Sequence, residues 1–283
     1  MRKSVLIVGA NSYIGKKIKP WLEKEPDVFD VDVASARNDE WKNIDFTKYS
    51  VIINVSGIAH IKISADMEPL FYKVNTQLAV DICKKAKESG CSQYIYMSSM
   101  NVYGDTSDVI NENMPPMPKN FYGKSKLMAD QQIAELGTEL FHTVSIRPPV
   151  VYGKGCKGNF PRLAKLAKFT PIFPNYKNIR SMIYIDNLCE LIRLIILNNC
   201  SGIFHPQNKE LTSTVEMVEI MSKAYGHKIW MTKIFNCLIS ITVDKIHIVN
   251  RMFANDSYSP SISNVFNYDY CVVSTEESIK RSL

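Results

Sequence analysis

The sequence has no uninterrupted apolar stretch of the ~18 residues that a membrane-spanning helix needs, and no signal-peptide cleavage pattern follows its first residues. Its seven cysteines contain no CxxC pair, and their odd number argues against a disulfide framework or a zinc site. No cluster of Arg and Lys alternates with aromatic residues, and the net charge of +6 comes from scattered lysines. We therefore expect a cytoplasmic protein with no integral membrane segment, no metal and no nucleic-acid partner.

The composition, 46% hydrophobic and 22% charged over 283 residues, is that of a globular protein with a sizeable core. Strand-like apolar runs alternate with helical patterns of three- and four-residue spacing through the first half of the chain. This alternation predicts an α/β fold, a Rossmann-type doubly wound parallel sheet. The expected strands are residues 5–8, 28–34, 51–55, 94–98 and 143–147, and the expected helices are residues 14–24, 74–87 and 124–136.

A glycine-containing turn lies between the first expected strand and the first expected helix. Gly9 suits the tight turn, and Gly15 suits close packing of helix on sheet, while the helix N-terminus offers free amides to a pyrophosphate. Ser12 replaces the usual middle glycine, but it is small and its hydroxyl can donate to a phosphate oxygen. We expect a dinucleotide to contact this turn through Gly9, Asn11, Ser12, Tyr13, Ile14 and Gly15. Two glycines six residues apart are a weak signal alone, since an ordinary strand–helix turn looks similar.

The residues after the second strand indicate which dinucleotide is bound. If that strand runs through Ala34, the acid expected to hold a ribose 2′-hydroxyl is missing, and Ser35 and Arg37 stand in its place. This pair suits a 2′-phosphate, so the prediction is NAD or NADP with a lean to NADP. A shift in register would return Asp32 to the ribose, and Arg37 would then be an ordinary surface arginine.

A serine, a tyrosine and a lysine form the candidate reaction centre. Tyr122 and Lys126 are spaced i and i+4, on one face of an expected helix. A neighbouring ammonium favours the phenolate and brings the phenol closer to acid–base use at neutral pH. Ser99 ends a strand at the carboxyl edge of the sheet, where ligands of such sheets bind.

A Pro- and Gly-rich stretch, residues 148–161, ends the regular alternation. We expect a dinucleotide-binding domain over residues 1–154 and a smaller, mainly substrate-binding portion over residues 155–283, with segments interleaved with the first domain. The most apolar late stretch, IFNCLISITVDKIHIV at residues 234–249, is expected to form a helix that packs within the smaller portion. A surface-seeking helix is the alternative.

The ordered set of motifs resembles the extended short-chain dehydrogenase/reductase family, also described as NAD-dependent epimerases/dehydratases, and within it a UDP-glucose 4-epimerase-like subgroup. GANSYIG, NVSGIAH, SSMNVYG, YGKSK, IRPPVVYGKG and RSMIYIDNL stand in the order and spacing of that family. The resemblance implies that Tyr122 is the catalytic acid/base, that Lys126 is its partner and a ribose ligand, and that Ser99 holds the reacting sugar oxygen. It also implies homodimers formed through the helix that carries Tyr122.

Further site residues follow from the same resemblance. It places Asp45 and Phe46 at the adenine, and Ser56, Gly57, Ala59, Asn75 and Pro149 along the rest of the cofactor. It assigns the nucleotide of the substrate to Asn159, Phe160 and Arg162, and its diphosphate to Arg180, for which a surface salt bridge is the alternative.

The implied function is hydride transfer at C4 of a nucleotide sugar, a UDP-hexose above all, as in a 4-epimerase. An NADPH-dependent reductase of a UDP-4-keto-6-deoxy sugar in polysaccharide biosynthesis would use the same residues. A non-catalytic NADP-sensing or RNA-associated protein on the same fold is a remote alternative, disfavoured because a binding module has no need of an activated phenol.

Overall fold

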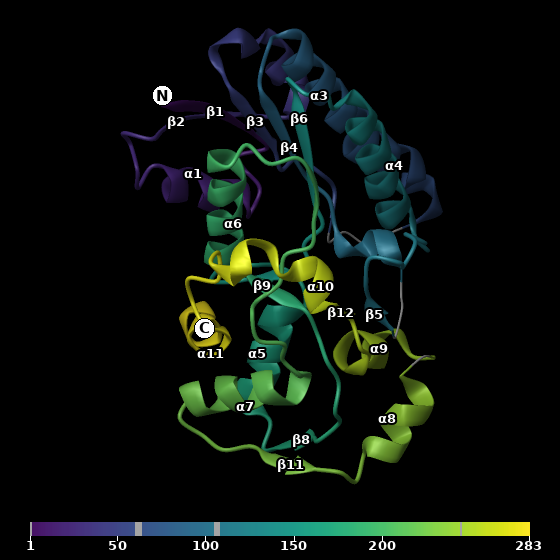
Figure 1. Ribbon diagram of the computed structural model, residues 1–283. Coiled ribbons are helices and arrows are strands. Elements are labelled where there is room, and N and C mark those ends of the chain that lie inside the picture. The colour runs from purple at the N-terminus through teal and green to yellow at the C-terminus, as the bar shows by residue number, and fades with distance from the viewer. Residues whose placement is uncertain (1, 60–63, 105–107, 244) are drawn as a thin grey trace.

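The computed structural model of the chain describes residues 2–59, 64–104, 108–243 and 245–283. A six-stranded parallel sheet forms the upper part of the molecule in Figure 1, with the order β2-β1-β3-β4-β6-β10. The chain runs outward from β1 to β2 and then crosses back to β3, so the direction of winding changes between β1 and β3. Ligands of such sheets bind at the carboxyl ends of the strands at this switch point. The strands are β1 (Lys3–Val8), β2 (Phe29–Ala34), β3 (Val51–Asn54), β4 (Gln93–Met97), β6 (His142–Ile146) and β10 (Gly202–Phe204).

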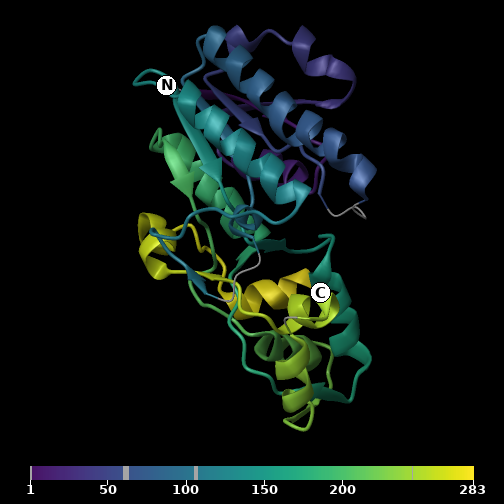
Figure 2. The same ribbon diagram turned by 90° about the vertical axis from the view of Figure 1, so that its right-hand side faces the viewer.

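Both faces of the sheet are buried, which explains the continuous apolar runs of its central strands. Val5 and Ile7 of β1 pack into one core cluster, and Leu6 and Val8 into another on the opposite face. Helices α1 (Gly15–Leu22) and α6 (Ile185–Leu197) cover the first face. Helices α3 (Leu78–Glu88) and α4 (Phe121–Leu136) lie side by side over the second, as Figure 2 shows.

The two outer strands differ from the inner ones. The outward side chains of β2, Asp30 and Asp32, are exposed, and they contact Arg2 and Tyr49 respectively. At the other edge, β10 contributes only three residues, paired with β6. Neither edge of the sheet therefore presents a long apolar strand.

The lower part of the molecule consists of short strands and helices. Its three two-stranded sheets pair β5 (Val109–Ile110) with β12 (Ser257–Tyr258), β7 (Val150–Tyr152) with β9 (Met182–Tyr184), and β8 (Ile172–Pro174) with β11 (Trp230–Thr232). The remaining helices are α2 (Glu68–Phe71), α5 (Asn159–Phe169), α7 (Thr214–Ala224), α8 (Asn236–Thr242), α9 (His247–Phe253), α10 (Pro260–Ser263) and α11 (Thr275–Ser282).

The doubly wound α/β fold predicted from the sequence is confirmed, with small shifts at the ends of the expected elements. The sequence prediction missed β10 and α6, which come late in the chain yet complete the sheet layer. Conversely, β5 precedes residue 154 but lies in the lower part of the molecule. Late elements thus lie in the sheet layer and an early element lies in the lower part. The interleaved arrangement and the domain limits at 154 and 155 remain a proposal.

The late apolar stretch does not form the buried helix that was expected. It contains two short helices, α8 and α9, and in α8 only Ile239 is buried while its other apolar side chains are exposed. Among the described residues, no helix is both long enough and apolar enough to cross a membrane.

Candidate active site

The turn after β1 leaves no room for side chains at its two glycines. Gly9 has a positive φ of 93°, and a Cβ there would lie 2.6 Å from the backbone nitrogen of Ser56. A Cβ on Gly15 would lie 2.7 Å from the carbonyl oxygen of Gly9. The amide of Gly15 donates to Ser12 Oγ at 3.0 Å, which closes the turn and leaves the Ser12 hydroxyl hydrogen free for a phosphate oxygen. The turn therefore fits the cofactor for which it was predicted.

The carboxyl end of β2 carries Ser35 and Arg37, as the sequence prediction requires. The strand runs through Ala34, which pairs with Val8, so Ser35 emerges beside the glycine turn. Asp32 lies inside the strand and accepts a hydrogen bond from the Tyr49 hydroxyl at 2.8 Å. The register that would bring Asp32 to a ribose is therefore not the one adopted, and Arg37 is exposed at this edge.

Two residues expected at the adenine are engaged in the protein itself. The Asp45 carboxylate accepts from the amide and the hydroxyl of Thr47, and these bonds lower its pKa. The Phe46 side chain is buried in the core cluster on the α3 side of the sheet. Any contact of Phe46 with an adenine would therefore use its backbone.

The loop after β3 is held by a buried chain of hydrogen bonds. Both the amide and the hydroxyl of Ser56 donate to Asn54 Oδ1, and Asn54 Nδ2 donates to the Tyr94 hydroxyl at 2.9 Å. Gly57 follows, and a Cβ there would lie 3.1 Å from both Lys126 Nζ and Asn75 Oδ1. Ala59 is exposed at the end of this described segment. The loop thus brings a bare backbone next to the lysine of the candidate centre.

Ser99 and Tyr122 are joined by a side-chain hydrogen bond. Ser99 follows β4 and caps a short 3-10 helix, where its Oγ accepts from the amide and the side-chain amide of Asn101, each at 3.2 Å. Since Asn101 supplies both donors, the Ser99 hydroxyl hydrogen is left to point at the Tyr122 oxygen. Asn101 is a positioning residue that the sequence reasoning missed, although its place two residues after Ser99 suits such a turn.

Lys126 lies one helical turn beyond Tyr122 in α4 but does not lower the pKa of that tyrosine. Its Nζ donates to the carbonyl of Met97 at 2.8 Å and sits over the Tyr96 ring. Burial raises the pKa of Tyr122, and only the Ser99 hydrogen bond opposes it. Burial also lowers the pKa of Lys126 to about 8. The expectation that Lys126 brings the phenol toward neutrality is therefore wrong for the chain alone, because the amine is itself desolvated and is directed at a carbonyl.

Asn75 links the loop after β3 to helix α4. It lies in a π-helical segment, Tyr72–Gln77, which directly precedes α3. Its Oδ1 accepts from the amide of Ile58 at 2.8 Å, and its Nδ2 donates to Ser125 Oγ at 3.1 Å. The Tyr96 hydroxyl donates to the Asn75 carbonyl at 2.8 Å, a bond that occupies a backbone oxygen of the widened turn. Such π-helical turns occur frequently at functional sites.

A buried ion pair lies beside the candidate reaction centre, next to the segment that carries Ser99. Arg147 Nε contacts Asp130 Oδ2 at 2.9 Å, and the same carboxylate oxygen accepts from the Ser98 hydroxyl. The Arg147 guanidinium also donates to the Tyr103 hydroxyl, which is 2.7 Å from His205 Nε2. Asp130 continues the i, i+4 series of Tyr122 and Lys126, and that spacing was the signal that could have identified it.

Three of the four expected substrate residues lie on helix α5, and the fourth, Arg180, lies just before β9. Asn159 is the first residue of α5, Arg162 is exposed on the same helix, and Phe160 is buried with its ring stacked 4.9 Å from that of Tyr152. Arg180 lies next to Asp256, while burial lowers its pKa. Pro149 is buried beside the segment that carries Ser99, since the carbonyl of Pro148 accepts from the Met100 amide.

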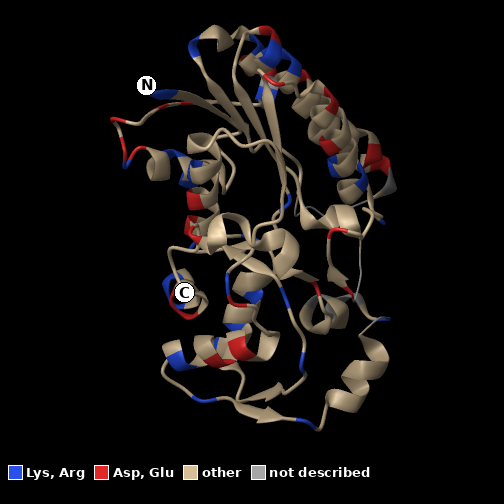
Figure 3. Ribbon diagram, in the orientation of Figure 1, with Lys and Arg blue, Asp and Glu red and all other residues tan. Residues whose placement is uncertain are grey.

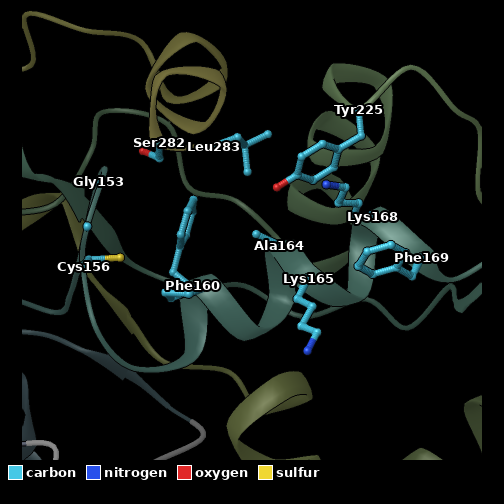
Figure 4. A pocket seen from close by; sticks show the side chains of 12 residues that line it. Gly153, Cys156, Phe160, Ala164, Lys165, Lys168, Phe169, Tyr225, Ser282 and Leu283 are labelled. Atoms are coloured by element: carbon cyan, nitrogen blue, oxygen red, sulfur yellow. The ribbon is translucent and has the colours of Figure 1, made fainter.

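One pocket, with a volume of about 440 Å³, opens between α5, α7 and the C-terminal helix α11. Figure 4 shows Phe160, Lys165, Lys168, Tyr225 and Leu283 around it. Neither Ser99, Tyr122 nor Lys126 lines this pocket. It is therefore separate from the candidate reaction centre.

The geometry agrees with the result of comparing the chain with known protein families. Residues 5–205 match the model of the NAD dependent epimerase/dehydratase family. The chain belongs to this family. Within the epimerase/dehydratase family, it is 28% identical to the UDP-glucose 4-epimerase of Vibrio cholerae, over 89% of this chain and 86% of that protein.

Two further comparisons show the range of chemistry among its relatives. The N-acetyl-alpha-D-glucosaminyl-diphospho-ditrans,octacis-undecaprenol 4-epimerase of Escherichia coli O157:H7 is 25% identical, over 71% of this chain and 66% of that protein. The crystal structure of dTDP-4-dehydrorhamnose reductase from Bacillus anthracis in complex with NADP has the same fold, with a TM-score of 0.65 and 22% identity over 82% of this chain and 83% of that one. The chain is thus an NAD(P)-dependent enzyme of a family that includes nucleotide-sugar epimerases.

Proposed function

We propose that the protein is a 4-epimerase of a nucleotide-activated hexose, with a UDP-hexose as the first candidate. The observation that carries the proposal is the hydrogen-bonded pair of Ser99 and Tyr122, with Lys126 one helical turn away. This group lies at the carboxyl edge of the sheet, and the loop after β3 links it to the glycine turn. The V. cholerae relative supports the proposal because the similarity extends over most of both chains.

The roles of the residues follow from the contacts of the chain. A bound nicotinamide would supply the site that accepts a hydride from C4 of the sugar and returns it. Tyr122 takes the proton of the 4-hydroxyl as C4 is oxidised, and gives it back to the same oxygen when C4 is reduced on its other face. Ser99 donates to that oxygen, because Asn101 fills its acceptor positions. Lys126 and Asn75 would hold the cofactor beside the Gly57 backbone, where a Cβ would lie in tight contact with both side chains.

The second portion would hold the rest of the substrate. Asn159, Phe160 and Arg162 would contact the nucleotide, and Arg180 would contact the diphosphate, since a guanidinium offers planar, paired donors to phosphate oxygens. The E. coli relative is named for a sugar joined through a diphosphate to undecaprenol. A sugar diphosphate is common to both substrate types, so Arg180 fits either. We also propose a homodimer formed through α4, in the cytoplasm.

Tyr122→Phe tests the catalytic assignment. The variant keeps the ring that packs edge-to-face on Phe71 and loses only the hydroxyl, so we expect turnover of UDP-glucose and UDP-galactose to fall at least a thousandfold, about 4 kcal/mol in activation free energy. Cofactor affinity should change less than threefold. Tyr176→Phe is the matched control, because Tyr176 also packs edge-to-face on a phenylalanine, Phe253, and has no assigned role in the site. Turnover within tenfold of the wild type in Tyr122→Phe contradicts the assignment.

A reductase that consumes NADPH is the second candidate, and the carboxyl end of β2 favours it. Ser35 and Arg37 stand at this edge, and Asp32 is engaged with Tyr49. A hydroxyl and a guanidinium suit a 2′-phosphate, whereas an epimerase of this kind has no need for NADPH, because it regenerates its cofactor in each cycle. A UDP-4-keto-6-deoxy sugar would be the substrate class of such a reductase.

Cofactor binding separates the two candidates. For the reductase we expect the purified protein to be free of cofactor and to bind NADPH at least tenfold more tightly than NADH. Arg37→Gln should remove most of that preference by weakening NADPH binding, because the proposal assigns the exposed Arg37 to the 2′-phosphate, which NADH lacks. Tightly retained NAD, with no effect of Arg37→Gln on either dissociation constant, supports the epimerase and contradicts the role given to Arg37.

A further inference from the structure

An exposed apolar surface covers the end of the molecule farthest from the parallel sheet. We call it the apolar tip and define it by six residues from four elements, α5, β8, β11 and α8, and from the loop before α8. Trp230 is 67% exposed, Ile234 76% and Leu238 62%. Trp230 pairs with Ile172 across the sheet of β8 and β11. Ile234 lies in the loop before α8, and Leu238 and Ile241 lie within α8. The members of the apolar tip are Phe169, Ile172, Trp230, Ile234, Leu238 and Ile241.

The apolar tip is a convex end of the molecule. In Figures 1 and 2, β8, β11 and α8 together form the lower extremity, away from the sheet layer that carries Ser99 and Tyr122. Monomeric proteins rarely expose so many large apolar side chains in one place unless the surface has a partner. An end of the molecule that exposes a tryptophan fits a broad, soft surface better than a narrow ligand.

The four elements that carry the apolar tip contain basic residues and no acidic ones, whereas the neighbouring helix α7 carries Glu216 and Glu219. Between Glu219 and Asp244 the sequence contains no acidic residue, whereas Lys228 and Lys233 flank β11 and are exposed. Lys168 lies with its amine 5.5 Å from the centre of the Phe169 ring. Figure 3 accordingly shows blue segments on both sides of β11 and no red on β8, β11 or α8. The surface therefore attracts an anionic partner.

We propose that the apolar tip docks the protein onto the surface of an anionic lipid bilayer. Apolar side chains next to lysines, with a tryptophan between them, are the features of segments that lie in the headgroup region. Helix α8 is short, so it lies on the bilayer and does not cross it. A second copy of the chain is the weaker partner, because a symmetric contact would bring Lys228 and Lys233 of both copies together with no acid among the described residues of the tip to pair them.

Vesicle sedimentation with the full chain tests the proposal. We expect the wild type to sediment with vesicles of phosphatidylcholine and phosphatidylglycerol, and at least tenfold less with phosphatidylcholine alone. Leu238→Glu should reduce sedimentation at least tenfold, and the uncharged Leu238→Ser by less. The matched control is Leu140→Glu, at a leucine that is 88% exposed on the loop between α4 and β6, which should behave as the wild type. Equal melting temperatures would exclude misfolding as the cause.

Separate experiments test the role of Lys228 and Lys233 and the alternative that a second copy of the chain is the partner. Lys228→Gln/Lys233→Gln should bind both vesicle types equally, and an unchanged preference for the anionic vesicles overturns the role of charge. A wild type that fails to sediment with anionic vesicles, or a Leu238→Glu variant that sediments like the wild type, overturns the proposal. Light scattering checks the second copy, since a mass lower for Leu238→Glu than for Leu140→Glu would make the tip a contact between chains instead.

Discussion

Lys126 brings a charged group into the interior of the protein. Its side chain is almost completely buried, and burial lowers its pKa from an ordinary 10.5 to about 8. Keeping it protonated at pH 7 therefore costs about 3 kcal/mol of folding free energy. The unfolded chain binds more protons than the folded chain between pH 8 and 10.5, so this cost decreases as the pH rises through that range. A residue held at such a cost is characteristic of a functional site.

Lys126→Met should consequently stabilise the chain while it abolishes turnover. Loss of the hydrogen bond to Met97 offsets part of the gain, which leaves a net stabilisation of about 1–2 kcal/mol at pH 7. The gain should disappear by pH 9.5, where less of the cost remains. Urea unfolding at both pH values measures this, with Lys124→Met at an exposed position of the same helix as the control. A variant that is less stable than the wild type at pH 7 contradicts the argument.

At this scale the sequence predicted residue types and proximity better than it predicted side-chain directions. The requirement for glycine at positions 9 and 15 followed from the spacing of the two residues, and the placement of Ser35 followed from the predicted end of the strand. The pKa of Tyr122 did not follow from the sequence, because i, i+4 spacing puts two residues on one face of a helix but does not determine which group the flexible lysine amine contacts. Here it ends at the carbonyl of Met97.

Among the elements, the π-helical segment before α3 has the most direct effect on the site. It sets the Asn75 side chain between the Ile58 amide and Ser125. Thr76, the next residue, donates from its hydroxyl to the Ser125 carbonyl at 2.7 Å. The two side chains thus bind the same helix, and Asn75 also binds the described part of the loop that would line the cofactor, at Ile58.

Asn75→Ala and Thr76→Val separate these two roles. Each should destabilise the protein by about 1–3 kcal/mol, since each leaves buried polar groups without a partner. Only Asn75→Ala should weaken cofactor binding, by at least tenfold, because it frees the loop that carries Gly57. Calorimetric titration with NAD and NADPH gives the affinities, and chemical unfolding gives the stabilities. Equal loss of affinity in both variants would mean that Asn75 acts on stability alone.

The elements that the sequence prediction missed have a common physical reason. A three-residue strand such as β10 is too short for its pattern to differ from a loop, and its pairing with β6 depends on the chain returning from the lower part. A single π-helical turn is too short for its periodicity to be distinguished from that of the adjoining α-helix, so residues 74–87 were expected as one regular helix. Helix α8 was expected to be buried because its composition is apolar, and composition does not distinguish an apolar helix inside a protein from one on its surface.

At the scale of the whole molecule, early and late parts of the chain are joined by long-range contacts. Trp21 of α1 donates to Glu190 of α6, and Arg193 of α6 contacts Glu25 just after α1, so a late helix is bound to the first helix of the fold. In the other direction, β5 pairs with β12. The order of motifs along the chain predicted the family and the sheet, whereas such long-range contacts leave no local pattern in the sequence.

The outer strands of the sheet have a consequence for the behaviour of the protein at high concentration. An unpaired strand edge is a template for β-strands of other molecules, and proteins guard against this with charges and short strands. Here Asp30 and Asp32 occupy the outward positions of β2, and β10 ends after three residues. A further strand would thus meet carboxylates at one edge of the sheet and only three residues at the other, and both features disfavour growth of the sheet from molecule to molecule.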